Sequence, residues 1–338
     1  MSLNNVVFRG VRVARLWQTQ ALWTRHYASS ASIVEDLKSR GPWSVPDYMS
    51  PTQSEKLDAA LEGHLPVGRH TRIPGELLSP GFHLAYFNPS TGEQLLGSDG
   101  YENHQAPGEE FPIRMWTGGS IEFNRATGLL LGAPAVCHES IANVKHQEKD
   151  GGERIFVTLD RKMKNTEDTS NDWAVRETRS LVYFNTQGAP SREKSFTRML
   201  DPPSTPAAFR QPVTPSALML FRYSALTYNG HKIHWDRDFA REEGLPGLIV
   251  HGPLTVTMML RWLSTTVLAS APQYDITAFS YRNLLPMFEG NELTLCCGAI
   301  NGATNIPVWI EDHRGSMTVS GTITLGPAEE PNLKKETS

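Results

Sequence analysis

Cysteine is scarce in this 338-residue sequence, which contains only Cys137 and the adjacent pair Cys296 and Cys297. Their spacing is neither that of a metal site nor that of a disulfide framework, which favours a reducing compartment. No apolar run approaches the ~18 residues of a membrane-spanning helix, so we expect no insertion into a membrane. A basic surplus is also missing, because 32 Lys and Arg stand against 36 Asp and Glu. This charge balance argues against nucleic acid as a partner.

Acidic residues are absent from the N-terminal segment as far as Glu35. Its arginines are spread among apolar residues and are followed by serines: Arg9, Arg12, Arg15, Arg25, Ser29, Ser30 and Ser32. This composition is typical of a mitochondrial transit peptide, with a basic tail or surface helix as the alternative. We therefore expect residues 1–30 to direct the chain to the mitochondrial matrix and to stand outside the fold.

The remaining length suits about two domains or one duplicated fold. A helix is expected over 52–64, where Thr52 and Glu55 have the form of a capping box, and a strand over 82–87 within Pro/Gly-rich loops. Alternating apolar residues predict four further strands, at 120–124, 136–144, 154–160 and 174–184. Turn-rich segments separate the last three, so an antiparallel meander is expected.

After a proline-rich segment the order of elements begins again, with a strand expected at 218–224. Residues 253–270 are apolar nearly all round, which predicts a buried helix. Four strands should follow, at 278–283, 292–300, 306–312 and 316–325. A long buried helix wrapped by an antiparallel sheet is the plan of a hot-dog fold, so we predict an α+β double hot-dog. The predicted units are a transit peptide 1–30, an N-terminal hot-dog 31–185, a linker 186–215, a C-terminal catalytic hot-dog 216–326 and a disordered tail 327–338.

Reactive side chains are densest between Tyr228 and Asp236. His231, His234 and Asp236 fall within six residues, and Asn229 lies beside them. Histidine is the usual general acid or base because its ordinary pKa of ~6.5 is close to working pH. Exposed loop histidines are the alternative. No third ligand accompanies the two histidines, so we expect no metal.

A second segment, residues 244–253, is apolar and ends in His251-Gly252-Pro253 at the start of the predicted buried helix. Free N–H groups at a helix N-terminus carry partial positive charge, and glycine lets a substrate approach the backbone closely. Such a site can hold a carbonyl oxygen as it becomes an enolate.

These two segments resemble the active-site signature of the MaoC-like (R)-specific enoyl-thioester hydratases, D-x-N-P-x-H followed by an apolar run that ends in H-G. Placing the signature histidine on His234 puts the aspartate on Asn229, the asparagine on His231 and the proline on Lys232. This variant resembles the branch that contains mitochondrial 3-hydroxyacyl-thioester dehydratase type 2 and the mesaconyl-CoA hydratases. Upstream segments support that branch, namely 97–100, 114–123 and 177–183.

The resemblance implies reversible dehydration of (3R)-3-hydroxyacyl thioesters of acyl-carrier protein or CoA, in mitochondrial fatty-acid synthesis and without a cofactor. His234 is expected to be the principal base, and the Gly252 N–H the oxyanion donor. Asn229 would orient the hydroxyl or water. The second proton carrier stays open between water relayed by His234, His231, and Asp236, whose other role would be to cap a helix over 238–243.

Other expectations concern the surroundings of this site. Tyr228 and Trp235 are expected to be packing residues. The N-terminal half should lend space to the acyl chain, and four of its residues could line a passage: Arg114, Met115, Trp116 and Arg125. A mesaconyl- or itaconyl-CoA-type hydratase and an inactive thioester-binding protein are the alternative functions. Either a homodimer or a pseudo-dimeric monomer fits.

Overall fold

The computed structural model describes residues 30–328, except 69, 150 and 171. Residues 1–29 of the predicted transit peptide and residues 329–338 of the predicted tail lie outside the described part. No described helix is long and apolar enough to cross a membrane.

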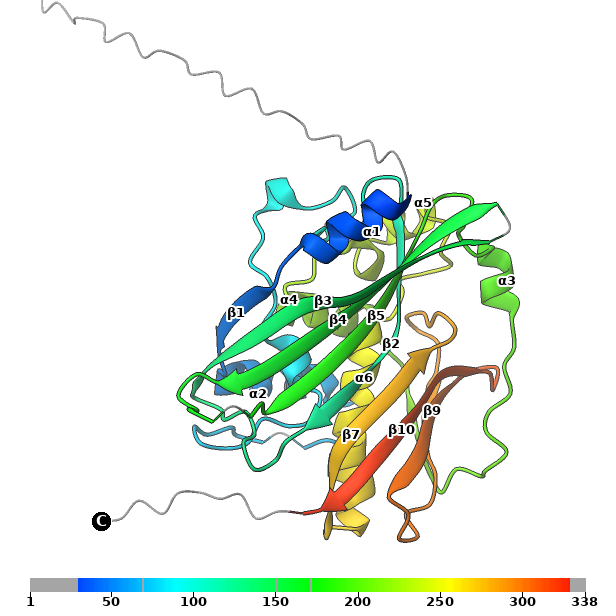
Figure 1. The fold of residues 1–338 in the computed structure, drawn as a ribbon. Helices are drawn as coiled ribbons and strands as arrows, with labels where there is room; N and C mark the ends of the chain where they lie inside the picture. Colours follow the sequence, from blue (N-terminus) through cyan, green and yellow to red (C-terminus); the bar gives the residue numbers. More distant parts are fainter. Residues whose placement is uncertain (1–29, 69, 150, 171, 329–338) are drawn as a thin grey trace, which may run out of the picture.

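The described residues form one antiparallel sheet with the strand order β1-β3-β4-β5-β2-β7-β10-β9-β8-β6. Adding five to each strand number of the first half gives the second half, because β1-β3-β4-β5-β2 corresponds to β6-β8-β9-β10-β7. The chain is therefore an internal duplication joined through β2 and β7 (Figure 1). The strands are β1 (Trp43–Tyr48), β2 (Ile113–Phe123), β3 (Pro134–Lys149), β4 (Gly152–Asn165), β5 (Val175–Phe184), β6 (Phe209–Val213), β7 (Tyr274–Asn283), β8 (Leu293–Cys297), β9 (Asn305–Asp312) and β10 (Met317–Pro327).

Two glycines make the junction between the halves sterically feasible. Gly118 and Gly119 lie on β2 between β5 and β7, and Gly119 is paired with Tyr281. A Cβ atom on Gly118 would collide with the carbonyl oxygen of Tyr281, and one on Gly119 with that of Thr178. Only glycine lets three backbones approach so closely here.

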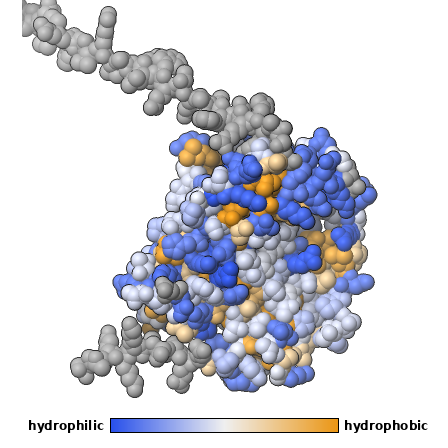
Figure 2. Space-filling view, viewed as in Figure 1, coloured by the Kyte–Doolittle hydropathy of each residue, from blue (hydrophilic) through white to orange (hydrophobic). Residues whose placement is uncertain are grey.

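Helices cover one face of the sheet, and α6 is the most deeply buried of them. Every residue from Leu254 to Trp262 is buried, and α6 passes behind β2 and β7 (Figure 1). The opposite face is mainly hydrophilic, with small apolar patches (Figure 2). The helices are α1 (Ser30–Ser39), α2 (Pro51–Leu61), α3 (Arg192–Thr197), α4 (Ala217–Leu226), α5 (Arg237–Glu242) and α6 (Gly252–Trp262); the short turns are η1 (Phe82–Ala85), η2 (Glu93–Leu95), η3 (Lys232–His234), the π-helical η4 (Leu263–Val267) and η5 (Leu268–Ser270).

The meander and the long helix were predicted correctly, but two predicted strands are helical. Residues 218–224 belong to α4, which begins where the Ser216 side chain accepts a hydrogen bond from the Met219 N–H. Within α4 the buried positions are 219, 220, 223 and 224, which is a helical spacing. Residues 82–85 form η1, because left-handed backbone at Gly81 and Phe87 interrupts an extended run. Short apolar runs fit both periods, so only packing distinguishes them.

The predicted capping box is also wrong. Helix α2 has Ser50 as its N-cap, without a side-chain capping bond, and Pro51 as its first residue. Glu55 instead accepts a hydrogen bond from the Arg72 N–H. The predicted linker 186–215 contains α3 and the edge strand β6.

Candidate active site

The loop after α4 folds back on itself and brings its polar side chains together. Tyr228 has a positive φ of 51°, and the Asn229 N–H donates to the Ser224 carbonyl. The Asn229 side-chain oxygen then accepts from the His231 N–H at 3.0 Å. The turn η3 follows, and His234 is its last residue.

His234 is held in one tautomer by the backbone. Its Nδ1 lies 2.8 Å from the Ile249 carbonyl oxygen, and the Ile249 N–H donates to the Ile233 carbonyl. Because a carbonyl only accepts, Nδ1 must carry the proton, and Nε2 of the neutral ring has the free lone pair. His234 is 8% exposed. Burial lowers its pKa to about 4; the bond to Ile249 raises the pKa and the Arg114 charge lowers it further. His234 is therefore a neutral base at physiological pH.

The ring of His251 packs directly against the ring of His234. The two rings stack with centroids 3.7 Å apart and planes 19° apart. His251 is fully buried, its Nε2 lies 2.9 Å from the Ser224 hydroxyl, and its Nδ1 has no hydrogen-bond partner among the described residues. Burial lowers the pKa of His251 well below its usual value, and the neighbouring His234 and His231 act in the same direction. The stacked pair is thus neutral, which avoids two adjacent positive charges.

Gly252 is the first residue of α6, directly after His251. An N–H at the start of a helix has no acceptor within the helix and lies at the positive end of its dipole. Of the first two residues of α6, only Gly252 has a backbone N–H to donate, because Pro253 has none. A Cβ atom at Gly252 would lie 3.1 Å from Asn283 Nδ2 and 3.6 Å from Trp116 Cβ. Glycine keeps the approach to this N–H open.

Asp236 and the two nearby aromatic residues take other roles. The Asp236 carboxylate accepts from the Asp238 and Phe239 N–H groups and caps α5, which is the role that the sequence favoured for it. Tyr228 and Trp235 are 66% and 43% exposed, so the prediction that they are packing residues is wrong. Trp235 Nε1 donates to the Gly230 carbonyl at the surface.

A pocket opens beside the active-site loop and the N-terminus of α6. It holds about 400 Å³, including its open mouth, and both halves line it: Leu84, Asn88, Tyr101, Glu102, Trp116 and Arg179 from the first, Tyr223, Thr227, Tyr228, Asn229 and Pro253 from the second. Burial raises the pKa of Glu102 to about 7, against the effect of Arg114. Asn229 and Pro253 place this pocket next to the active-site loop and the start of α6, although His234 and Gly252 are not among its lining residues.

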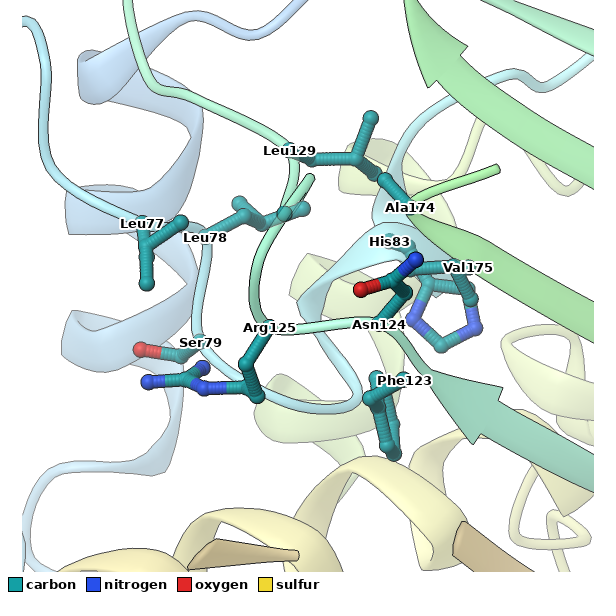
Figure 3. A pocket seen from close by; sticks show the side chains of 11 residues that line it. Leu77, Leu78, Ser79, His83, Phe123, Asn124, Arg125, Leu129, Ala174 and Val175 are labelled. Carbon is teal, nitrogen blue, oxygen red and sulfur yellow. The ribbon is translucent and has the colours of Figure 1, made fainter. Parts of the chain in front are cut away.

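Only one of the four residues predicted to line a passage lies in this pocket. Trp116 lines it, whereas Met115 is 40% exposed. The Arg114 guanidinium stacks on the Tyr101 ring, 3.8 Å from its centroid. Arg125 pairs with Asp275 and lines a different cavity (Figure 3).

That other cavity borders a buried charge cluster that the sequence did not indicate. His83, which lies near Phe123 and Asn124 in Figure 3, is 3.9 Å from the Glu177 carboxylate. Burial lowers the pKa of His83 to about 4, partly offset by Glu177. Arg161 and Arg179 pair with Glu177 at 2.9 and 2.6 Å. Burial alone would raise the pKa of Glu177, but the two guanidinium groups bring it to about 2. The paired charges give this cluster a structural role.

No group of three or more His, Cys, Asp or Glu side chains in the described part of the chain could hold a metal ion.

Comparisons with known proteins agree with this geometry. The family model for hydroxyacyl-thioester dehydratase type 2 matches residues 81–289. A mitochondrial hydroxyacyl-thioester dehydratase type 2 of Schizosaccharomyces pombe is 32% identical over 83% of this chain and 96% of its own length. A mesaconyl-C(4)-CoA hydratase of Chloroflexus aurantiacus is 31% identical over 74% of this chain and 84% of its own length. A mitochondrial hydroxyacyl-thioester dehydratase type 2 of Saccharomyces cerevisiae is 25% identical over 75% of this chain and 87% of its own length.

Two solved structures establish the fold. A MaoC-like dehydratase from Phytophthora capsici superposes with a TM-score of 0.60 at 11% identity, over 87% of this chain and 99% of that one. A Mycobacterium tuberculosis protein described as a double hot-dog superposes with a TM-score of 0.57 at 12% identity, over 87% and 98%. The predicted double hot-dog is confirmed.

Proposed function

Because the chain belongs to the hydroxyacyl-thioester dehydratase type 2 family, we propose that it is a hydro-lyase that removes water from (3R)-3-hydroxyacyl thioesters, with His234 as its base. The observation that carries this assignment is the 2.8 Å contact from His234 Nδ1 to the Ile249 carbonyl. It leaves Nε2 unprotonated, on a ring that stacks against the residue preceding Gly252.

The groups already in the site account for each proton and electron pair that the elimination moves. His234 Nε2 takes the proton from C2, and the electron pair moves onto the thioester oxygen, where the Gly252 N–H and the α6 dipole stabilise the developing charge. The electrons then return to form the C2–C3 double bond as the C3–O bond breaks. The His234 imidazolium gives its proton to the departing hydroxyl, so that water leaves and the neutral base is restored. The Asn229 amide orients the hydroxyl without titrating.

The two halves of the duplication contribute different parts of the active site. The second half supplies the base and the oxyanion donor, and the first half supplies pocket walls for the acyl group, including Tyr101 and Trp116. A monomer with this internal duplication is the pseudo-dimer of two hot-dogs. The carrier of the thioester is acyl-carrier protein or CoA, and the location is the mitochondrial matrix. The mitochondrial relatives and the composition of residues 1–30 support that location.

Hydration of crotonyl-CoA, the reverse reaction, tests the activity and the base together. The purified protein should consume the enoyl absorbance, and His234→Ala should lower kcat/KM by about 100- to 10,000-fold, the usual contribution of a general base. His313→Ala is the matched control, because His313 is exposed on the turn between β9 and β10. Absence of hydration by the parent protein would contradict the proposed reaction and leave the dicarboxyl-CoA hydratase and the thioester-binding protein as alternatives. An unaffected His234→Ala would remove His234 from the mechanism.

A second substrate class is favoured by one residue of the pocket. Arg179 lines it, and a cation there suits the free carboxylate of a short dicarboxyl-CoA such as mesaconyl-CoA. Its charge is already shared with Glu177, however, which weakens this reading relative to a simple acyl chain. Parallel assays decide between the two: a kcat/KM for mesaconyl-C4-CoA above that for crotonyl-CoA would favour the dicarboxyl substrate.

A further inference from the structure

The signature carboxylate is replaced by Asn229, yet a carboxylate from the other half of the molecule reaches the active-site loop. Asp99 precedes β2 by fourteen residues, and its Oδ2 lies 3.3 Å from His231 Nε2. The His231 ring stands edge-on to His234, with centroids 5.4 Å apart and planes 88° apart. His231 thus connects Asp99 to the proposed base.

The contact between the Asp99 loop and the His231 loop is fixed by both backbones. The Lys232 N–H donates to the Asp99 carbonyl at 2.9 Å, and Lys232 Nζ donates to the Ser98 carbonyl at 2.8 Å. Gly100 and Gly230 pack so tightly that a Cβ atom on either would strike the carbonyl oxygen of the other. The juxtaposition of Asp99 and His231 is therefore built into the interface of the two halves.

Other first-half groups hold the Asp99 carboxylate and surround His231. Asp99 Oδ1 accepts from the Tyr101 N–H at 3.1 Å, and Oδ2 accepts from Arg114 Nη2 at 2.7 Å. The Tyr101 ring centroid lies 3.8 Å from the Arg114 guanidinium carbon and 5.7 Å from the centroid of the His231 ring. Burial lowers the pKa of His231 well below its usual value, and the charges of Arg114 and His234 act in the same direction. The 3.3 Å contact from His231 Nε2 to Asp99 Oδ2 therefore joins a neutral ring to a carboxylate.

We infer that Asp99 is a positioning residue for the dehydration, which fixes His231 as the Nε2–H tautomer beside the proposed base. This inference rests on the proposed function. A carboxylate accepts only, so Nε2 of neutral His231 carries the proton, and Nδ1 is left as the acceptor. His234 has the opposite tautomer, because its Nδ1–H donates to Ile249.

Nitrogen NMR of the full chain labelled in its histidine rings tests the pairing without any assay of activity. We expect His231 to be the Nε2–H tautomer and His234 the Nδ1–H tautomer, with Asp99→Asn shifting the His231 signals and Asp238→Asn leaving them unchanged. Asp238 is the matched control, because its side chain is 85% exposed and pairs with Arg241 on the surface of α5. An Nδ1–H tautomer at His231 in the unaltered protein would overturn the inference, even if Asp99→Asn failed to fold.

A double-mutant cycle with crotonyl-CoA tests the consequence for catalysis. In metal sites, loss of a residue that orients a ligating histidine lowers activity or metal affinity by about 10- to 100-fold. We expect Asp99→Asn to lower kcat by a similar factor with little change in KM. Asp99→Glu should restore part of the loss. The double variant Asp99→Asn/His231→Gln should be no slower than His231→Gln alone, since Asp99 acts through His231. If the losses of kcat in the two single variants multiplied in the double variant, the inference would be overturned. Inactivity of the parent protein would overturn only the proposed reaction.

Discussion

The burial of His234 makes a sharp prediction about the pH dependence of catalysis. An ordinary histidine, with a pKa of 6.5, is about 3% unprotonated at pH 5.0, whereas one with a pKa of about 4 is about 90% unprotonated. The unprotonated Nε2 is the proposed base. The kcat/KM measured at pH 5.0 should therefore be most of that measured at pH 7.5. The two cases differ by a factor of about 30 at pH 5.0.

The assay must isolate the enzyme's own titration. Crotonyl-pantetheine is the suitable substrate, because it lacks the phosphate monoester of CoA, whose second pKa of about 6 falls within the range studied. Samples held at pH 5.0 and returned to pH 7.5 before assay distinguish titration from unfolding. His313→Ala should reproduce the parent profile. An acid limb with its midpoint near pH 6.5 would refute the claim that burial keeps His234 neutral.

Three further perturbations test the structure. Burial lowers the pKa of His83 and His234 to about 4, so the unfolded state binds more protons below pH 6.5. Stability should therefore fall as the pH drops from 6.5 towards 4, by about 1 kcal/mol per histidine at pH 5.5, seen as a lower thermal midpoint than at pH 7.5; an unchanged midpoint would contradict this. Gly252→Ala should lower kcat by about tenfold or more while the protein stays folded, because its methyl group obstructs the approach to a donor worth about 100- to 1,000-fold in other enzymes; full activity would remove that N–H from the mechanism. Glu177→Ala should cost about 3 kcal/mol in urea unfolding, because Arg179 loses this carboxylate partner while the buried Arg161 keeps Glu139; a loss below about 1 kcal/mol would show that the cluster relaxes.

Much of the fold followed from patterns that are local in the chain. Alternating residues in 154–160 and 174–184 predicted strands that became β4 and β5, and the all-round apolar segment after Gly252 predicted the buried α6. The active-site loop and the His251-Gly252 pair were also recognisable, because they lie within about 25 residues of one another. The failures were short apolar runs, at 82–87 and 218–224, whose period is ambiguous until one face is packed.

The sequence by itself therefore determined the duplication, the family and the chemical types of the reacting groups. Tertiary structure alone decided how those groups behave. The pKa of His234 and its tautomer depend on burial and on the Ile249 carbonyl, fifteen residues away. Asp99 reaches His231 only because β2 pairs with β7 and brings the two halves together. Desolvation and contacts between distant segments are properties of the packed molecule, so local sequence patterns do not carry them.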